Sequence, residues 1–150
     1  MSARRMWVFS PNSGEKKIPD LVRIDVEKQI NDVAEQQLKE TFIRLDLRFK
    51  GQFCYIDAFT EPAVDETWNE EIMQETREEC IERLRNSPIH LCRLRYFDKD
   101  KWGFSYYNYS NEKYELATYP GGEFFGKPED AFLASAAFYR YSIIRKIPMK

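Results

Sequence analysis

The chain has 150 residues, of which 43% are hydrophobic and 32% charged, a composition that predicts a folded globular domain. Its formal net charge of −2 lacks the strong basic excess of a general nucleic-acid binder, and no apolar run approaches the roughly 20 residues of a membrane span. Three widely spaced cysteines argue against a disulfide framework: Cys54, Cys80 and Cys92. We therefore expect one cytoplasmic domain over residues 1–150.

The N-terminal part of the chain predicts one strand and one helix. Met6–Ser10 is a short apolar run that Pro11 stops, which is typical of an edge strand. Asp20 is a good N-cap for a helix that ends at about Lys39. The apolar residues of this helix recur at a spacing near 3.6 and form one face; they are Val22, Val26, Ile30, Val33 and Leu38.

A β-hairpin is predicted next. Phe42–Phe49 alternates between apolar and charged residues, as a half-buried strand does, and Gln52–Thr60 returns. A two-residue turn at Lys50-Gly51 would fix the register and place Arg44 opposite Asp57 on the exposed face. The interpretation of this pair is a cross-strand ion pair that supports the fold.

An acidic stretch and a capped helix follow the hairpin. Residues 63–75 are rich in carboxylates and predict a surface loop or a loosely docked helix. Thr76 and Glu79 fit the capping-box pattern at the start of a helix, which should end near Asn86 because Pro88 cannot continue it.

The C-terminal half predicts a meander and a last helix. Three strands separated by short polar turns cover Ile89–Phe97, Trp102–Tyr109 and Tyr114–Tyr119. Pro128 begins the helix, with two acidic residues in its first turn, and residues 143–150 form a tail. The order β-α-β-β-α-β-β-β-α predicts an α+β fold. Its antiparallel sheet of about five to six strands is built from hairpins, with helices packed mainly on one face.

The two hairpins bring arginines and aromatic residues together. A Lys99-Asp100 turn would place the aromatic residues of one strand on the face that carries the arginines of the other. If the hairpins are neighbours, eight residues share this face: Arg44, Arg48, Tyr55, Arg93, Arg95, Trp102, Phe104 and Tyr106. Sheets that bind single-stranded RNA stack bases on aromatic rings while arginines contact phosphates. The alternative is that a helix covers this face and the arginine stems pack over the rings.

An enzymatic centre would have to be built from Cys54, Asp57 and His90. The predicted register buries Cys54 in an apolar row, where a thiol is unreactive, and turns Asp57 to the other face. His90 and Cys92 would project together toward the core, but two ligands are too few for zinc. The chain has no phosphate-binding loop, dinucleotide fingerprint or zinc-protease motif. We expect no metal and no cofactor, and an enzyme is the less favoured interpretation.

Four segments together resemble a small family of uncharacterised prokaryotic proteins: WVFSP at 7–11, KGQFCYIDAFTEP at 50–62, HLCRLRYF at 90–97 and GEFFGKPEDAF at 122–132. The resemblance would cover most of the chain and implies a bacterial-type cytoplasmic protein, without an activity or a site. Our first functional hypothesis is a non-enzymatic protein-interaction or regulatory module that binds a protein partner or itself. The second is a nucleic-acid binder that uses the arginine–aromatic face, and the third is the enzyme.

Overall fold

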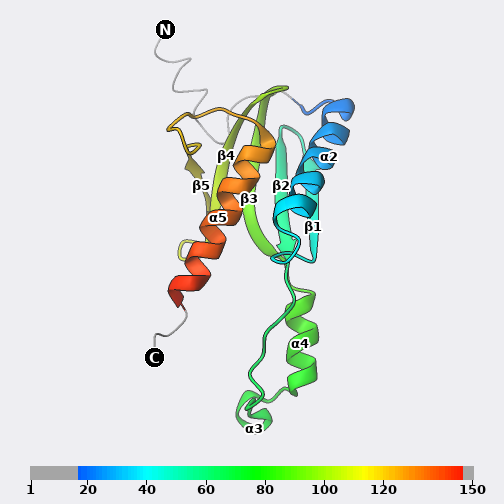
Figure 1. The fold of residues 1–150 in the computed structure, drawn as a ribbon, viewed down its shortest axis with the longest axis vertical. Helices are drawn as coiled ribbons and strands as arrows, with labels where there is room; N and C mark the ends of the chain where they lie inside the picture. Colours follow the sequence, from blue (N-terminus) through cyan, green and yellow to red (C-terminus); the bar gives the residue numbers. More distant parts are fainter. Residues whose placement is uncertain (1–16, 147–150) are drawn as a thin grey trace.

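The computed structural model describes residues 17–146, so the strand expected at Met6–Ser10 lies outside the described residues. One antiparallel sheet forms its centre, and each strand pairs with the next along the chain, in the order β1-β2-β3-β4-β5 (Figure 1). The strands are β1 (Arg44–Lys50), β2 (Phe53–Phe59), β3 (Ile89–Asp98), β4 (Lys101–Asn108) and β5 (Lys113–Ala117). The predicted α+β fold with an antiparallel meander is confirmed.

Two long helices lie across one face of the sheet (Figure 1). They are α2 (Asp20–Gln37), which packs against β1, and α5 (Pro128–Lys146), which packs against β3 and β4. The N-cap of α2 is Pro19 rather than Asp20, and it makes no side-chain capping bond. The last helix also runs into the tail expected over residues 143–150.

The core lies between these helices and the sheet. Its largest fully buried side chains include Trp102 and Phe132, and the apolar residues predicted for one face of α2 contribute Val26 and Ile30. The buried hydroxyl of Tyr119 donates a hydrogen bond to the Trp102 carbonyl oxygen at 2.7 Å. Trp102 is therefore held by packing and by a hydrogen bond to its carbonyl oxygen. It lies on the face of the sheet that α2 and α5 cover, which we call the helix side.

The hairpin of β1 and β2 has the predicted faces but a different register. Gly51, with φ +60°, occupies the first central position of the turn, where a two-residue hairpin needs a residue that accepts positive φ. The turn is thus Gly51-Gln52, and every pair is displaced by two residues, which preserves the faces. Arg44 lies opposite Phe59, so the expected pairing of Arg44 with Asp57 is wrong.

A β-bulge reverses the faces expected for β4. The register of β3 and β4 shifts between Tyr96 and Asp98, and a one-residue shift moves every side chain of a strand to the other face. Three aromatic residues expected beside the arginines therefore lie on the helix side: Trp102, Phe104 and Tyr106. Trp102 and Phe104 are 0% and 4% exposed, so the expectation that they share a face with the arginines of β3 is wrong.

A second β-bulge changes the position of the histidine. Ile56 pairs with Cys92, but the next residue of β2, Asp57, pairs with His90. Leu91 is the extra residue of the bulge, and it turns His90 to the face opposite Cys92. The expectation that His90 and Cys92 project together toward the core is wrong.

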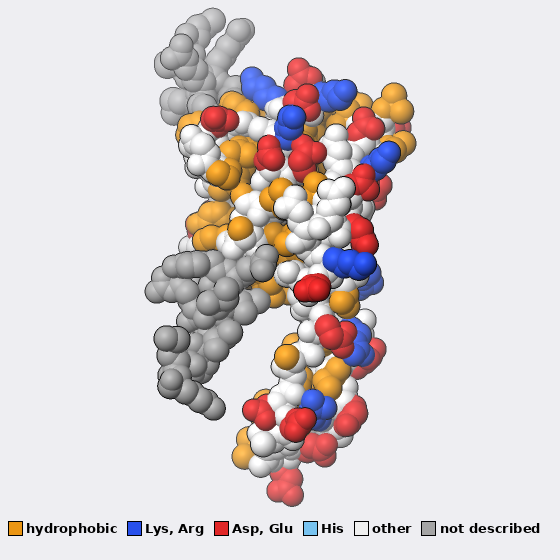
Figure 2. Space-filling model, in the orientation of Figure 1, with side chains coloured by type: hydrophobic (Ala, Val, Ile, Leu, Met, Phe, Trp, Pro, Cys, Tyr) orange, Lys and Arg blue, Asp and Glu red, His pale blue; other side chains and the backbone are white. Residues whose placement is uncertain are grey.

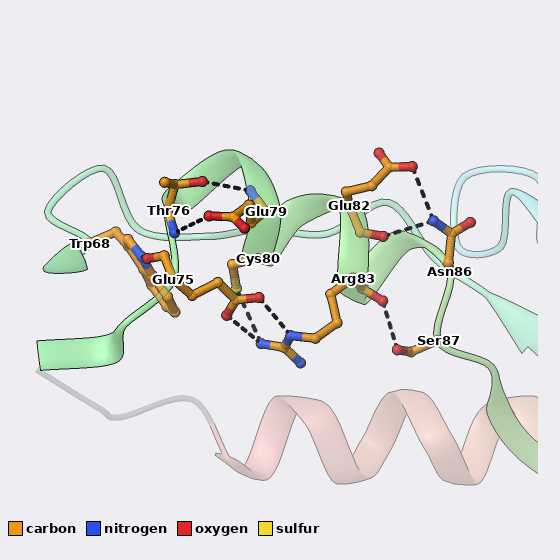
Figure 3. Close-up of polar contacts among 9 residues, drawn as sticks. All are labelled: Trp68, Glu75, Thr76, Glu79, Cys80, Glu82, Arg83, Asn86 and Ser87. Carbon is orange, nitrogen blue, oxygen red and sulfur yellow. Dashed lines mark hydrogen bonds and ion pairs between the residues drawn. The ribbon is translucent and has the colours of Figure 1, made fainter. Parts of the chain in front are cut away.

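Residues 60–88, which we call the arm, extend from one end of the sheet (Figure 1). They contain α3 (Glu70–Met73) and α4 (Arg77–Arg85), so the acidic stretch includes one short helix. The predicted capping box is confirmed: Thr76 and Glu79 exchange side-chain-to-backbone hydrogen bonds, both 3.0 Å long (Figure 3). The arm therefore contains two short helices, and α4 has a complete capping box.

Polar contacts tie the arm to itself. Arg83 makes two hydrogen bonds to Glu75, at 2.9 and 3.1 Å, and the Trp68 indole donates to the Glu75 carbonyl oxygen at 2.7 Å (Figure 3). The hydrogen bonds from Arg83, and its charge, lower the pKa of the Glu75 carboxyl. Because its stabilising contacts are local, we treat the arm as a unit that folds against itself.

Candidate functional site

The outer face of the sheet is the face opposite α2 and α5, and none of the helices that the structure describes lies on it. Five of the eight residues predicted to form the arginine–aromatic face are there: Arg44, Arg48, Tyr55, Arg93 and Arg95. The alternative was that a helix covers these arginines, and none of the described helices does so. The outer face is therefore the first candidate for a binding surface.

Each arginine of the outer face lies over an aromatic ring. The distances from guanidinium carbon to ring centroid are 3.8 Å for Arg44 over Phe59, 5.2 Å for Arg48 over Tyr55, 4.6 Å for Arg93 over Phe53 and 4.6 Å for Arg95 over Phe97. A stacked guanidinium keeps its N–H groups in its own plane, where they remain able to donate to an anion. The outer face therefore carries a set of cationic groups that lie over aromatic rings.

The four arginines differ in accessibility. Arg44 and Arg48 are exposed and Arg93 is half-buried, whereas Arg95 is only 6% exposed. Burial and the neighbouring charge of Arg93 lower the pKa of Arg95 below its ordinary value. Arg95 is therefore a packed member of the face, and the other three are the ones that a ligand can reach.

Tyrosines occupy the middle of the outer face. The ring of Tyr107 lies 5.0 Å from that of Tyr114 and 4.7 Å from that of Tyr109, and Tyr55 meets Tyr114 edge-on at 5.6 Å. Burial is the main cause that raises the pKa of Tyr114, with the charge of Asp57 adding to it, so its hydroxyl stays neutral. Tyr55, Tyr107 and Tyr114 are half-buried and Tyr109 is 54% exposed, and their contacting rings form an aromatic surface beside the arginines.

Asp57 and His90 form a hydrogen-bonded pair beside these rings. Oδ1 of Asp57 lies 2.8 Å from Nδ1 of His90, and Oδ2 accepts a hydrogen bond from Arg48 at 3.1 Å. The Asp57 side chain is 5% exposed and that of His90 34%. Because a carboxylate only accepts hydrogen bonds, this contact places a proton on Nδ1, and in the neutral ring the lone pair then lies on Nε2.

The position of His90 is fixed by three further contacts. Its backbone N–H donates to the hydroxyl of Tyr109 at 2.7 Å, and its ring lies 4.9 Å from Tyr107 and nearly parallel to Tyr109 at 6.3 Å. No hydrogen bond joins Nε2 to another of the described residues. The pair therefore presents a basic nitrogen whose orientation is set by its surroundings.

Two hollows meet at His90. One, of about 550 Å³, lies on the outer face, and besides His90 its walls include Arg48, Lys50, Tyr55 and Tyr107. The other, of about 520 Å³, lies between the arm, the start of β3 and α5, and its walls are mainly apolar, with Leu84, Ile89, Leu91 and Phe138. The outer hollow has cationic and aromatic walls, so it suits an anionic ligand that also carries an aromatic group.

The cysteines take no part in this site. Cys54 and Cys92 are both 0% exposed on the helix side, and burial raises the pKa of each thiol, that of Cys92 to about 12. The expected centre of Cys54, Asp57 and His90 is therefore divided, with Cys54 on the opposite face from the other two. Among the described residues, no three His, Cys, Asp or Glu side chains come together as metal ligands.

Tyr106, the third predicted residue displaced by the bulge, belongs to the helix side. Its hydroxyl donates to Glu115 at 3.0 Å, a bond that raises the pKa of the tyrosine, and its ring lies 5.2 Å from Phe138.

Within the part of the chain that the structure describes, no helix is long and apolar enough to cross a membrane. No protein-family model, curated protein or solved structure matches the chain.

Proposed function

We propose that the outer face binds a single-stranded nucleic acid. The observation that carries this proposal is the alternation of accessible arginines with half-buried aromatic rings on a sheet face free of described helices. Arg44, Arg48 and Arg93 would contact phosphates, and bases would stack on tyrosine rings or on the guanidinium planes. Neighbouring strands lie about 4.8 Å apart, so the distance from β1 to β5 is about 19 Å, enough for several nucleotides.

The charge distribution supports this proposal despite the acidic total. Residues 60–88 hold nine acidic side chains against three arginines, a net charge of −6. The rest of the chain therefore carries +4 of the total of −2. Figure 2 shows acidic side chains gathered over the arm. Residues 1–16 and 147–150 contribute +3 of this +4, so the described residues outside the arm carry a net charge of +1. Attraction of a polyanion would therefore come from the local group of arginines on the outer face.

Binding of a fluorescent single-stranded RNA, followed by anisotropy, tests the proposed function. With Arg44, Arg48, Lys50 and Arg93 as phosphate contacts, we expect log K to fall with log salt at a slope of about −2 to −3. A duplex of the same sequence should bind more weakly, because its bases are not free to stack. The proposal fails if the single strand does not bind at low salt, or binds with no dependence on salt.

A second candidate function is self-association through the arm, and a separate observation favours it. Ile72 and Met73 of α3 are 76% and 52% exposed in the acidic arm. Preorganised elements with exposed apolar residues lose little entropy on docking. We propose that the arm of one copy lies on the cationic outer face of another, because that face has the complementary charge.

Sedimentation velocity tests this second candidate. We expect a dimer at about 0.01 M salt that dissociates at about 1 M salt, where the Debye length has fallen from roughly 30 to roughly 3 Å. Replacing Ile72 with aspartate should favour the monomer, while the matched change Leu21→Asp, at a residue that is 77% exposed on α2, should not. A monomer at low salt over the whole concentration range would contradict the idea.

A further inference from the structure

We propose that the Asp57–His90 pair cleaves the bound strand, with Nε2 of His90 taking the proton from a ribose 2′ hydroxyl. This inference rests on the proposed function and narrows its ligand to RNA, because DNA has no 2′ hydroxyl. The pair adjoins the outer hollow, whose walls hold Arg48 and Lys50. A phosphate in that hollow would lie beside a basic nitrogen and two cations.

The bulge at Leu91 is the first observation behind this inference. An unbroken ladder would have turned His90 into the core beside Cys92, whereas the extra residue turns it toward Asp57. Bulges commonly redirect a side chain next to a functional site. Without the bulge His90 would be a core residue, so the bulge is what brings it to the outer face.

The hydrogen bonds of Asp57 are the second observation. Asp57 is 3% exposed and points one oxygen at Nδ1 of His90 and the other at Arg48. A buried acid that accepts from Nδ1 holds the ring in the tautomer with a free Nε2, and it stabilises the charge that the ring acquires when it takes a proton. Asp57 is therefore a positioning residue, and His90 is the general base.

The proposed step is an internal transesterification. The 2′ oxygen forms a bond to phosphorus, the bond from phosphorus to the 5′ oxygen breaks, and the 2′ proton passes to Nε2 of His90. The departing 5′ oxygen takes a proton from water, and the hydroxide left behind recovers the proton from His90. The products are one strand that ends in a 2′,3′-cyclic phosphate and one that begins with a 5′ hydroxyl, and the reaction needs no metal or redox partner.

Two cations, Arg48 and Lys50, would stabilise the negative charge that develops on the phosphoryl group in the transition state. Arg48 is held by Asp57 through one nitrogen, and its side chain is 53% exposed, which leaves other N–H groups able to donate. Lys50 is exposed on the same strand, two residues further along. Preorganised cations at a phosphoryl group are a main source of rate enhancement in such reactions.

The experiment uses the full chain with end-labelled RNA and EDTA, under single-turnover conditions with protein in excess, and anisotropy confirms that the RNA is bound. We expect wild type to produce a 2′,3′-cyclic phosphate end, and an all-2′-deoxy strand to stay intact. His90→Ala and His90→Gln should each slow cleavage about 100-fold or more, the usual contribution of a general base. Glutamine can still donate to Asp57 but is not a base, so it separates catalysis from packing.

Imidazole rescue adds a measurement that a structural role would not affect. Free imidazole should restore part of the cleavage rate in His90→Ala and change nothing in wild type. If wild type binds RNA and leaves it intact, or if both His90 variants cleave as fast as wild type, the inference is overturned while the proposed function stands. If wild type does not bind RNA at all, the proposed function fails and the inference fails with it.

Discussion

Replacing Trp102 with alanine is expected to lower the free energy of unfolding by about 3–5 kcal/mol, the usual cost of removing a large aromatic side chain from a core. Trp102 is 0% exposed and meets Tyr96 edge-on at 5.0 Å. Its indole also donates to the Lys99 carbonyl oxygen at 2.9 Å, a bond that alanine cannot make. Urea unfolding followed by circular dichroism measures the loss.

The matched control is the same substitution in the arm. Trp68 is half-buried, and its indole also donates to a carbonyl oxygen, that of Glu75, which belongs to the arm. Trp68→Ala should leave the unfolding midpoint of the sheet nearly unchanged and raise amide exchange in α4. A loss as large as that of Trp102→Ala would show that the arm and the sheet unfold together, contrary to our description of the arm.

The elements were readable from the sequence because their signals are local. The capping box of Thr76 and Glu79, the proline that begins α5 and the alternation of β1 each involve a few neighbouring residues. The fold class followed from their order. Register is a property of two strands together, and there the sequence reasoning failed.

The β-bulge between β3 and β4 could have been predicted from the pattern of large and small residues in the two strands. Trp102 and Phe104 alternate with Gly103 and Ser105, which indicates by itself that the tryptophan side of β4 is buried. In β3 the apolar residues include Leu94, which the expected register sets opposite Ser105 rather than Phe104. Matching the two buried sides across the Lys99-Asp100 turn requires a shift of one residue, and such a shift is a bulge.

The Asp57–His90 pair was missed for a related reason. Asp57 is a charged residue within a strand that is otherwise apolar toward its end, and a buried carboxylate needs partners. That signal could have identified Asp57 as important, but it could not name the partner. The partner depends on the bulge at Leu91, which has no glycine or proline to mark it.

The reversal of two outer-face charges is the prediction that bears most directly on function. The double variant Arg44→Glu/Arg93→Glu should weaken binding of single-stranded RNA by about 100-fold or more, since two charge-assisted hydrogen bonds contribute about 3 kcal/mol or more together. The slope of log K against log salt should also become shallower by about 1.4, because two phosphate contacts are lost. Neither arginine pairs with a carboxylate among the described ion pairs, so the fold should tolerate the change.

The double variant Arg83→Glu/Arg85→Glu is the matched control, because it changes the net charge by the same amount within the arm. Arg83 and Arg85 pair with Glu75 and Glu61 within the arm, and neither lies on the outer face. If binding responds only to total charge, both double variants should weaken it equally, and the outer face would lose its assigned role. If binding depends on the stacked arginines, the arm variant should retain most of the affinity, because the guanidinium groups over Phe53 and Phe59 remain in place.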